Sequence, residues 1–210
     1  MFAVLFEVQP KSEKWDQYLG IAKMLKPELE AIDGFIENVR YRSLTRPGWL
    51  LSLSIWRDEK ALVRWRTQAV HHGAQERGRF EIFGDYHLRV GELTGKESTE
   101  RTDETRTGAG TIVTLVDAKR AVKDTPPEQI AASLGLQKGL VAWDVFDAVL
   151  TPGDLILLMT SRDQKTADEL KRSISLEEGA RLRQVRILRD YGMFDRRESP
   201  QYYPAVEGAS

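Results

Sequence analysis

Residues 46–60, RPGWLLSLSIWRDEK, return as residues 151–165, TPGDLILLMTSRDQK, and these two stretches decide the fold. Each copy places a Pro-Gly turn before an apolar run and ends in Arg-Asp-x-Lys. The same shift of 105 residues holds without a gap from about residue 29 to residue 86. A match of such long period is typical of two copies of one small module. We therefore expect a dimer fused into one polypeptide.

Each copy is predicted to follow the order βαββαβ. Alternating apolar residues over 2–8 predict a half-buried strand. Helical spacing follows from Ser12 to Ile32, where Pro27 should kink or divide the helix. Asp58 is expected to cap a second helix that runs to about Arg77. The remaining predicted strands of the first half are 35–44, 49–56 and 86–93. The second half repeats the order with strand 111–116, a helix near 127–134, strands 140–150 and 155–160, helix 163–173 and strand 182–194.

These elements predict an α+β protein made of two tandem ferredoxin-like units. Each unit is a four-stranded antiparallel sheet with two helices on one face. Strand 49–56 carries bulky residues on both faces, so the uncovered face needs a partner. The second sheet is the expected cover, in a face-to-face or barrel-like pseudo-dimer within the chain.

The expected domain boundaries are residues 1–93 and 111–197. They are separated by a polar linker, 94–110, and followed by a tail, 198–210. The tail is either disordered or an extended arm whose tyrosines dock on a neighbouring surface. A further homodimer of the whole chain stays open.

Composition excludes several classes of function. The chain has 210 residues, a formal net charge of −1 and no cysteine, which rules out disulfides and thiolate chemistry. The balanced charge argues against nucleic acid as a partner, and no apolar run is long enough to span a bilayer. The start of the chain lacks the basic region of a signal peptide, so a cytoplasmic location without membrane contact is expected.

The most distinctive segment follows the strand that ends in Trp56. It consists of Trp65-Arg66, His71, Ala74-Gln75 and Gly78-Arg79, spaced W-R-x4-H-x2-A-Q-x2-G-R. In this segment, and across most of residues 1–93, the chain resembles the antibiotic biosynthesis monooxygenase family. The second half departs from the pattern, because Leu170, Leu176 and Ala180 stand where the first half has Trp65, His71 and Gln75. Any chemistry is therefore expected in the first half.

The resemblance implies a dimeric α/β barrel and an oxidoreductase. Characterised relatives oxygenate electron-rich aromatic or quinol-type small molecules, often without metal or flavin, by removing a proton and letting the carbanion react with dioxygen. No metal is expected, since three histidines without a supporting carboxylate or cysteine cluster make a poor site. A haem-degrading function is less favoured, because strand one has no asparagine and residue 75 is glutamine. The alternative from another class is a non-catalytic small-molecule-binding or sensing module.

The candidate catalytic bases are His71 and Glu7. A histidine titrates near neutral pH, and a partly buried carboxylate has a raised pKa. The competing interpretations are a helix-end histidine and a glutamate paired with an arginine. The candidate substrate-binding residues are Trp65, Asn38, Arg40, Tyr41, Trp56 and Gln75, with Asn38 or Arg40 stabilising an anion.

The structural alternatives for these residues are also open. Trp65 can serve core packing instead of lining a cavity, and Asn38 and Arg40 can face solvent. On one continuous helix Trp65 and His71 lie on different faces, and Arg66 belongs to a solvated basic face.

Overall fold

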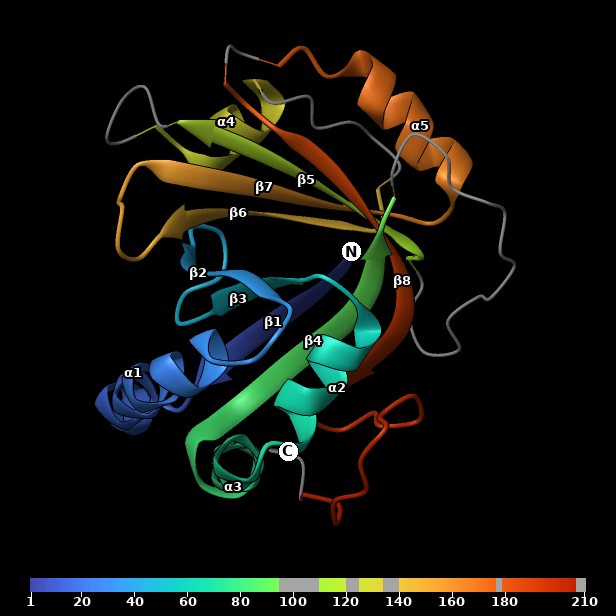
Figure 1. Ribbon diagram of the computed structural model, residues 1–210. Helices are drawn as coiled ribbons and strands as arrows, with labels where there is room; N and C mark the ends of the chain where they lie inside the picture. The colour runs from blue at the N-terminus through green and yellow to red at the C-terminus, as the bar shows by residue number, and fades with distance from the viewer. Residues whose placement is uncertain (95–109, 120–124, 134–139, 177–178, 207–210) are drawn as a thin grey trace.

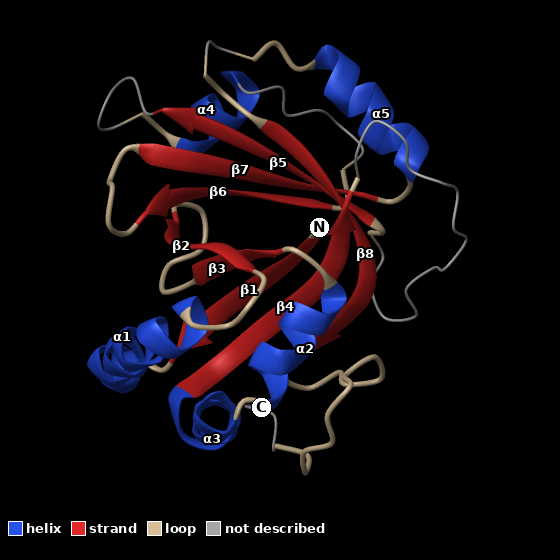
Figure 2. Ribbon diagram, viewed as in Figure 1, coloured by secondary structure: helices blue, strands red, loops and turns tan. Residues whose placement is uncertain are grey.

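The computed structural model describes residues 1–94, 110–119, 125–133, 140–176 and 179–206. Within this part of the chain, eight strands close into a barrel in the order β1-β3-β2-β6-β7-β5-β8-β4 (Figure 2). The strands are β1 (Phe2–Pro10), β2 (Phe35–Ser43), β3 (Leu50–Trp56), β4 (Phe83–Leu93), β5 (Ile112–Lys119), β6 (Ala142–Ala148), β7 (Asp154–Ser161) and β8 (Leu182–Gly192). The helices are α1 (Trp15–Glu30), α2 (Glu59–Thr67), α3 (Ala69–Arg77), α4 (Pro127–Ser133) and α5 (Gln164–Ser173), with short helical turns η1 (Ser12–Lys14) and η2 (Gly78–Ile82).

The two halves contribute equivalent sheets to the barrel. The first half supplies β4-β1-β3-β2 and the second supplies β8-β5-β7-β6, joined through the antiparallel pairs β2–β6 and β4–β8. Side chains alternate across each strand, so one set points into the barrel and the other set points towards the helices. Leu51, Leu53 and Ile55 lie in the interior with residues of both halves, including Leu115 and Phe146. The predicted α+β fold and the pseudo-dimer within one chain are confirmed.

The helices cover the outside of the barrel in two groups. Figure 1 shows α1, α2 and α3 on one side of the barrel and α4 and α5 on the other. The repeat extends to the helix caps, because Asp58 accepts a hydrogen bond from the Ala61 N–H and Asp163 accepts one from the Thr166 N–H, both at 2.8 Å. A carboxylate at this position satisfies an N–H that the first turn leaves free.

One helix prediction in the first half was wrong, and one alternative of another is excluded. Helix α1 is not divided at Pro27, which lies in its last turn. The single helix expected from Asp58 to Arg77 is two helices, because Gln68 is extended, with ψ at 131°. The Gln68 side chain accepts a hydrogen bond from the His71 N–H at 2.7 Å and so caps α3. Glutamine is not a preferred capping residue, so the sequence carries no signal for this break.

Gly34 shows why the repeat preserves glycine at the end of the first helix. Its φ of +92° is unfavourable for other residues, and a Cβ there would lie 2.6 Å from the Ala61 Cβ. Its counterpart Gly139 and most of the predicted linker lie outside the described residues. The domain boundaries therefore stay predictions. None of the described helices is long and apolar enough to cross a membrane.

Candidate active site

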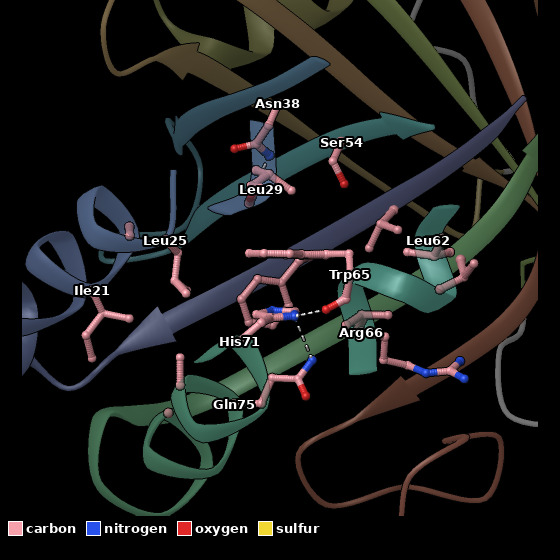
Figure 3. A pocket seen from close by; sticks show the side chains of 18 of the residues that line it. Ile21, Leu25, Leu29, Asn38, Ser54, Leu62, Trp65, Arg66, His71 and Gln75 are labelled. Carbon is pink, nitrogen blue, oxygen red and sulfur yellow. Dashed lines mark hydrogen bonds between the residues drawn. The ribbon is translucent and has the colours of Figure 1, made fainter. Parts of the chain in front are cut away.

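A cavity of about 200 Å³ lies between the outer face of the first-half sheet and helices α1, α2 and α3. Its walls are mostly apolar: α1 contributes Ile21, Leu25 and Leu29, α2 contributes Leu62, and β1 contributes Val4 and Phe6. Figure 3 shows Trp65 and His71 projecting into this space, with the α1 side chains on one side and Asn38 on another. The arrangement suits a small and largely apolar molecule.

Trp65 and His71 form a stacked pair in the cavity. Their ring centroids are 3.9 Å apart and their planes differ by 12°. The break at Gln68 makes this contact, since it turns α3 relative to α2 and brings together residues that one helix would separate. The expectation that these two side chains lie on different faces was therefore wrong.

The backbone fixes the protonation pattern of the His71 ring. Nδ1 lies 2.8 Å from the Trp65 carbonyl oxygen, which can only accept, so Nδ1 carries the hydrogen and donates it. Nε2 then holds a lone pair, and it has no hydrogen-bond partner within the described part of the chain. Burial lowers the pKa of His71 to about 4, although the Trp65 carbonyl opposes this shift. The imidazole is therefore neutral at physiological pH and can accept a proton.

Polar groups enter the cavity from β2 and α2. Asn38 donates to the Ser52 hydroxyl at 2.9 Å and to the Leu53 carbonyl at 3.2 Å, which occupies its amide hydrogens. Arg40 and Arg66 also line the cavity, and the Nε atom of each is buried without a hydrogen-bond partner. Among the described residues neither guanidinium pairs with a carboxylate. Arg40 forms a side-chain hydrogen bond with Tyr18, which also lines the cavity. The cavity thus presents cationic groups without a carboxylate partner, which an anionic ligand can neutralise.

Three of the expected site residues lie elsewhere. The Glu7 and Tyr41 side chains point into the barrel, on the other face of the sheet. Glu7 loses solvation on burial, but Arg89 and Arg46 more than compensate, so its pKa is lowered, opposite to the raised pKa expected from the sequence. Trp56 is buried beneath α2, where its Nε1 donates to the Ser54 hydroxyl at 2.9 Å. The structure brings together Trp65, His71, Gln75, Asn38 and Arg40.

The second half also contributes to the cavity. Arg189 and Tyr191 of β8 and Pro200 of the tail line it. Around its own helix α5 the second half is filled instead, because Leu170, the counterpart of Trp65, is buried in a continuous apolar core. This asymmetry is consistent with chemistry in the first half alone.

Comparisons with known proteins identify the family. Residues 1–77 match the family of antibiotic biosynthesis monooxygenases. Over 97% of its length the chain is 49% identical to a protein of Pyricularia oryzae (strain 70-15) called jasmonate monooxygenase ABM, and the match covers 99% of that relative. The chain belongs to the antibiotic biosynthesis monooxygenase family. A crystal structure of an aldoxime dehydratase shares the fold, with a TM-score of 0.56 at 8% identity, covering 89% of this chain and 79% of that one.

Membership in this family makes the chain a monooxygenase, an enzyme of the oxidoreductase class. The cavity contains a neutral imidazole stacked on an indole, apolar walls and two guanidinium groups that pair with no carboxylate among the described residues. These parts can hold an apolar molecule, take up a proton and stabilise a negative charge. Within the described residues, no cluster of three or more His, Asp or Glu side chains is placed to bind a metal ion.

Sequence reasoning missed several lining residues of this monooxygenase. Arg66 was assigned to a solvated helix face, but the break at Gln68 leaves it beside the cavity. Ser52 and Ser54 share the outer face of β3 with Trp56, so the period of two could have found them. Nothing in the sequence pattern signals Arg189, Tyr191 or Pro200, because only barrel closure carries them to the first half.

The buried imidazole predicts a pH-dependent stability for this monooxygenase. From pH 6.5 down to about 4 the unfolded chain binds a proton at His71 that the folded chain does not. The stability is therefore complete above pH 6.5 and decreases as the pH falls, by up to about 3 kcal/mol. Urea unfolding at pH 7, 6 and 5 measures it. His71→Gln should remove the slope in this window, whereas His72→Gln, at an exposed position, should retain it; an equal slope in both variants would contradict the assignment.

Proposed function

We propose that this monooxygenase takes a proton from an electron-rich aromatic or quinol-type small molecule and lets the resulting carbanion react directly with dioxygen. The observation that carries the proposal is the Trp65–His71 pair in an apolar cavity. Nδ1 of His71 is committed to the Trp65 carbonyl, which leaves the lone pair of Nε2 for the substrate proton. As a substrate anion forms beside the ring, its charge raises the His71 pKa and favours the transfer.

The substrate is the reductant in this scheme. His71 takes a proton from a CH₂ group, and the carbanion forms a C–O bond with dioxygen to give a hydroperoxide after protonation. Loss of the second hydrogen of that carbon as a proton breaks the O–O bond, forms a carbonyl group and releases water. One oxygen atom enters the product and the other becomes water, with all electrons supplied by the substrate.

Arg40 is the better candidate for stabilising the anion. The Asn38 amide hydrogens are already bound by Ser52 and Leu53, so this side chain has no free donor for a developing negative charge. Arg40 lines the same wall and has a buried Nε without a partner. A guanidinium in a largely apolar cavity binds an anion more strongly than the same group in water.

A second candidate substrate class is a small apolar carboxylic acid. The name of the relative from Pyricularia oryzae points to jasmonate. Arg40 and Arg66, whose buried Nε atoms lack a hydrogen-bond partner, are suited to a carboxylate. Hydroxylation of a saturated carbon in such an acid needs two electrons from an external reductant, because the substrate alone cannot reduce the second oxygen atom to water. The two classes therefore differ in stoichiometry.

Oxygen uptake by the purified full-length chain tests the proposal. The substrates are an anthrone-type aromatic, whose CH₂ group the scheme requires, and jasmonic acid, each with and without NADPH as reductant. We expect one oxygen molecule consumed for each anthrone-type molecule converted to a carbonyl product, without NADPH. Turnover that requires NADPH and occurs only with the acid would favour the second class and contradict the first.

Replacing Arg40 by methionine is expected to raise the KM for an acidic substrate by about 10- to 100-fold. This is the loss of affinity expected when one charge-assisted hydrogen bond to the substrate is removed. Steady-state kinetics with jasmonic acid and its uncharged methyl ester measure the effect. Arg42→Met is the matched control, because Arg42 lies on the same strand face, is exposed and does not line the cavity. An equal rise in KM for acid and ester would show that Arg40 does not bind the carboxylate.

A further inference from the structure

The segment after β8, residues 193–206, forms an ordered arm against the first half (Figure 1). Arg79 of η2, which is 3% exposed, donates to the Met193 carbonyl at 2.7 Å and to the Pro204 carbonyl at 3.2 Å. One buried guanidinium thereby holds both ends of the arm. The sequence allowed two interpretations of the tail 198–210, a disordered end or an extended arm. Its described residues, 198–206, follow the extended arm.

A second arginine organises the arm from within. Arg196 donates to the Gln201 carbonyl at 3.0 Å, and its guanidinium lies 5.3 Å from the centre of the Tyr203 ring and 5.6 Å from that of Tyr191. Tyr203 also stacks on His72 of α3, with centroids 5.8 Å apart. The neighbouring Tyr202 is 91% exposed. The two tyrosines therefore differ in environment although they are adjacent in sequence.

The arm reaches the candidate site through Gln75. Gln201 Nε2 lies 3.3 Å, and the Tyr203 hydroxyl 3.4 Å, from Gln75 Oε1. Two donors from the arm hold the carbonyl end of this amide, which leaves its nitrogen 3.5 Å from His71 Nδ1. Both nitrogens carry hydrogens, since Nδ1 donates to the Trp65 carbonyl, so this contact packs the amide against the ring without a hydrogen bond. Pro200 of the same arm forms part of the cavity wall. Figure 3 shows Gln75 directly beside the His71 ring.

We propose that Gln201 and Tyr203 are positioning residues of the active site, fixing the Gln75 amide beside His71 so that the first-half cavity is complete only with this segment of the second half. The inference rests on the proposed function of His71. It explains why Arg79 belongs to the distinctive segment of the sequence, since Arg79 anchors the arm rather than contacting the cavity. It also gives the second half a part in the site beyond closing the barrel.

The test compares Tyr203→Ala with Tyr202→Ala in the full-length chain. NMR titration of the His71 ring, without substrate, reports its environment independently of activity. We expect Tyr203→Ala to raise the His71 pKa from about 4 towards 6.5, because water reaches the ring. Oxygen uptake with the accepted substrate should show a kcat/KM lowered by about tenfold in Tyr203→Ala. Tyr202→Ala should match the unchanged chain in both measurements. Tyr203→Phe keeps the ring but lacks the hydroxyl that donates to Gln75, so its values should fall between those of the unchanged chain and of Tyr203→Ala.

Further outcomes separate this inference from the proposed function. If Tyr203→Ala shifts the His71 titration while His71→Ala retains full oxygen uptake, positioning is supported and the role of His71 as base is rejected. If the titration and kcat/KM of Tyr203→Ala equal those of the Tyr202→Ala control, the inference is overturned. Gln201→Ala removes the two side-chain hydrogen bonds of Gln201, to Gln75 and to the Arg66 carbonyl, and leaves Tyr203 in place. It gives the same comparison if Tyr203→Ala does not fold.

Discussion

Glu7→Gln is expected to lower the free energy of unfolding by about 3–5 kcal/mol, the cost of leaving a buried charge without its partner. The Glu7 side chain is 5% exposed and that of Arg89 is 4% exposed, and they form an ion pair inside the barrel. The second Glu7 oxygen accepts from Arg46 at 2.5 Å. Arg46 in turn pairs with Asp144 of the second half at 2.6 Å, so the network joins the two halves.

Urea unfolding at pH 7 measures this effect, and Glu92→Gln is the matched control. Glu92 pairs with Arg186 across β4 and β8, but its side chain is 41% exposed, so the same substitution should cost less than about 1 kcal/mol. The lowered pKa of Glu7 adds a pH test. Its contribution is complete above the unfolded pKa of about 4.3 and is lost as the pH falls through the folded value. Equal losses in the two variants would contradict the role of the network.

His71→Ala is expected to lower kcat by about 100- to 10,000-fold, the usual contribution of a positioned general base. The physical reason is that the substitution removes Nε2, the proton acceptor in the cavity, while Trp65 and the apolar walls remain. Steady-state oxygen uptake measures the loss. KM should change much less than kcat, because the imidazole acts mainly in the transition state.

A pH profile and a second variant serve as controls for His71. In the unchanged chain, activity that depends on neutral His71 should stay constant from pH 7 to 5 and fall towards pH 4. Glu7→Gln should retain this profile once its reduced stability is allowed for, since Glu7 lies on the other face of the sheet. Undiminished kcat in His71→Ala would exclude this residue as the base.

Much of the fold could be predicted because its signals are local or repeated. Alternation along β3, the Asp58 and Asp163 caps and the Pro-Gly turns each act within a few residues, and the repeat shows them twice. The second sheet followed as the partner from a simple requirement, because a sheet with apolar residues on both faces needs a cover on each. That requirement left a face-to-face and a barrel-like arrangement open, and the family resemblance implied the barrel. A further homodimer stays a prediction.

The site was only partly predictable. The spacing of Trp65, His71 and Gln75 located the cavity wall. The period of two placed Asn38 and Arg40 opposite Val39 and Tyr41, either at a cavity mouth or in solvent, and in the structure both line the cavity. The same period assigns Glu7 and Tyr41 to the interior, as their alternation with outward residues on β1 and β2 shows. Periodicity assigns a residue to one face of a strand, but it does not say which face carries a cavity.

The sequence by itself therefore determined the duplicated α+β architecture, the caps and turns, and the half of the chain that carries the family's residues. Tertiary structure decided what those residues do. The break at Gln68, which stacks His71 on Trp65, depends on a side-chain cap that has no sequence signature. Arg46 of the Glu7 network and Asp144 are 98 positions apart, and Gln75 and Gln201 of the arm are 126 apart. Such contacts between the halves form only when the barrel closes, so the local patterns that describe one module do not reveal them.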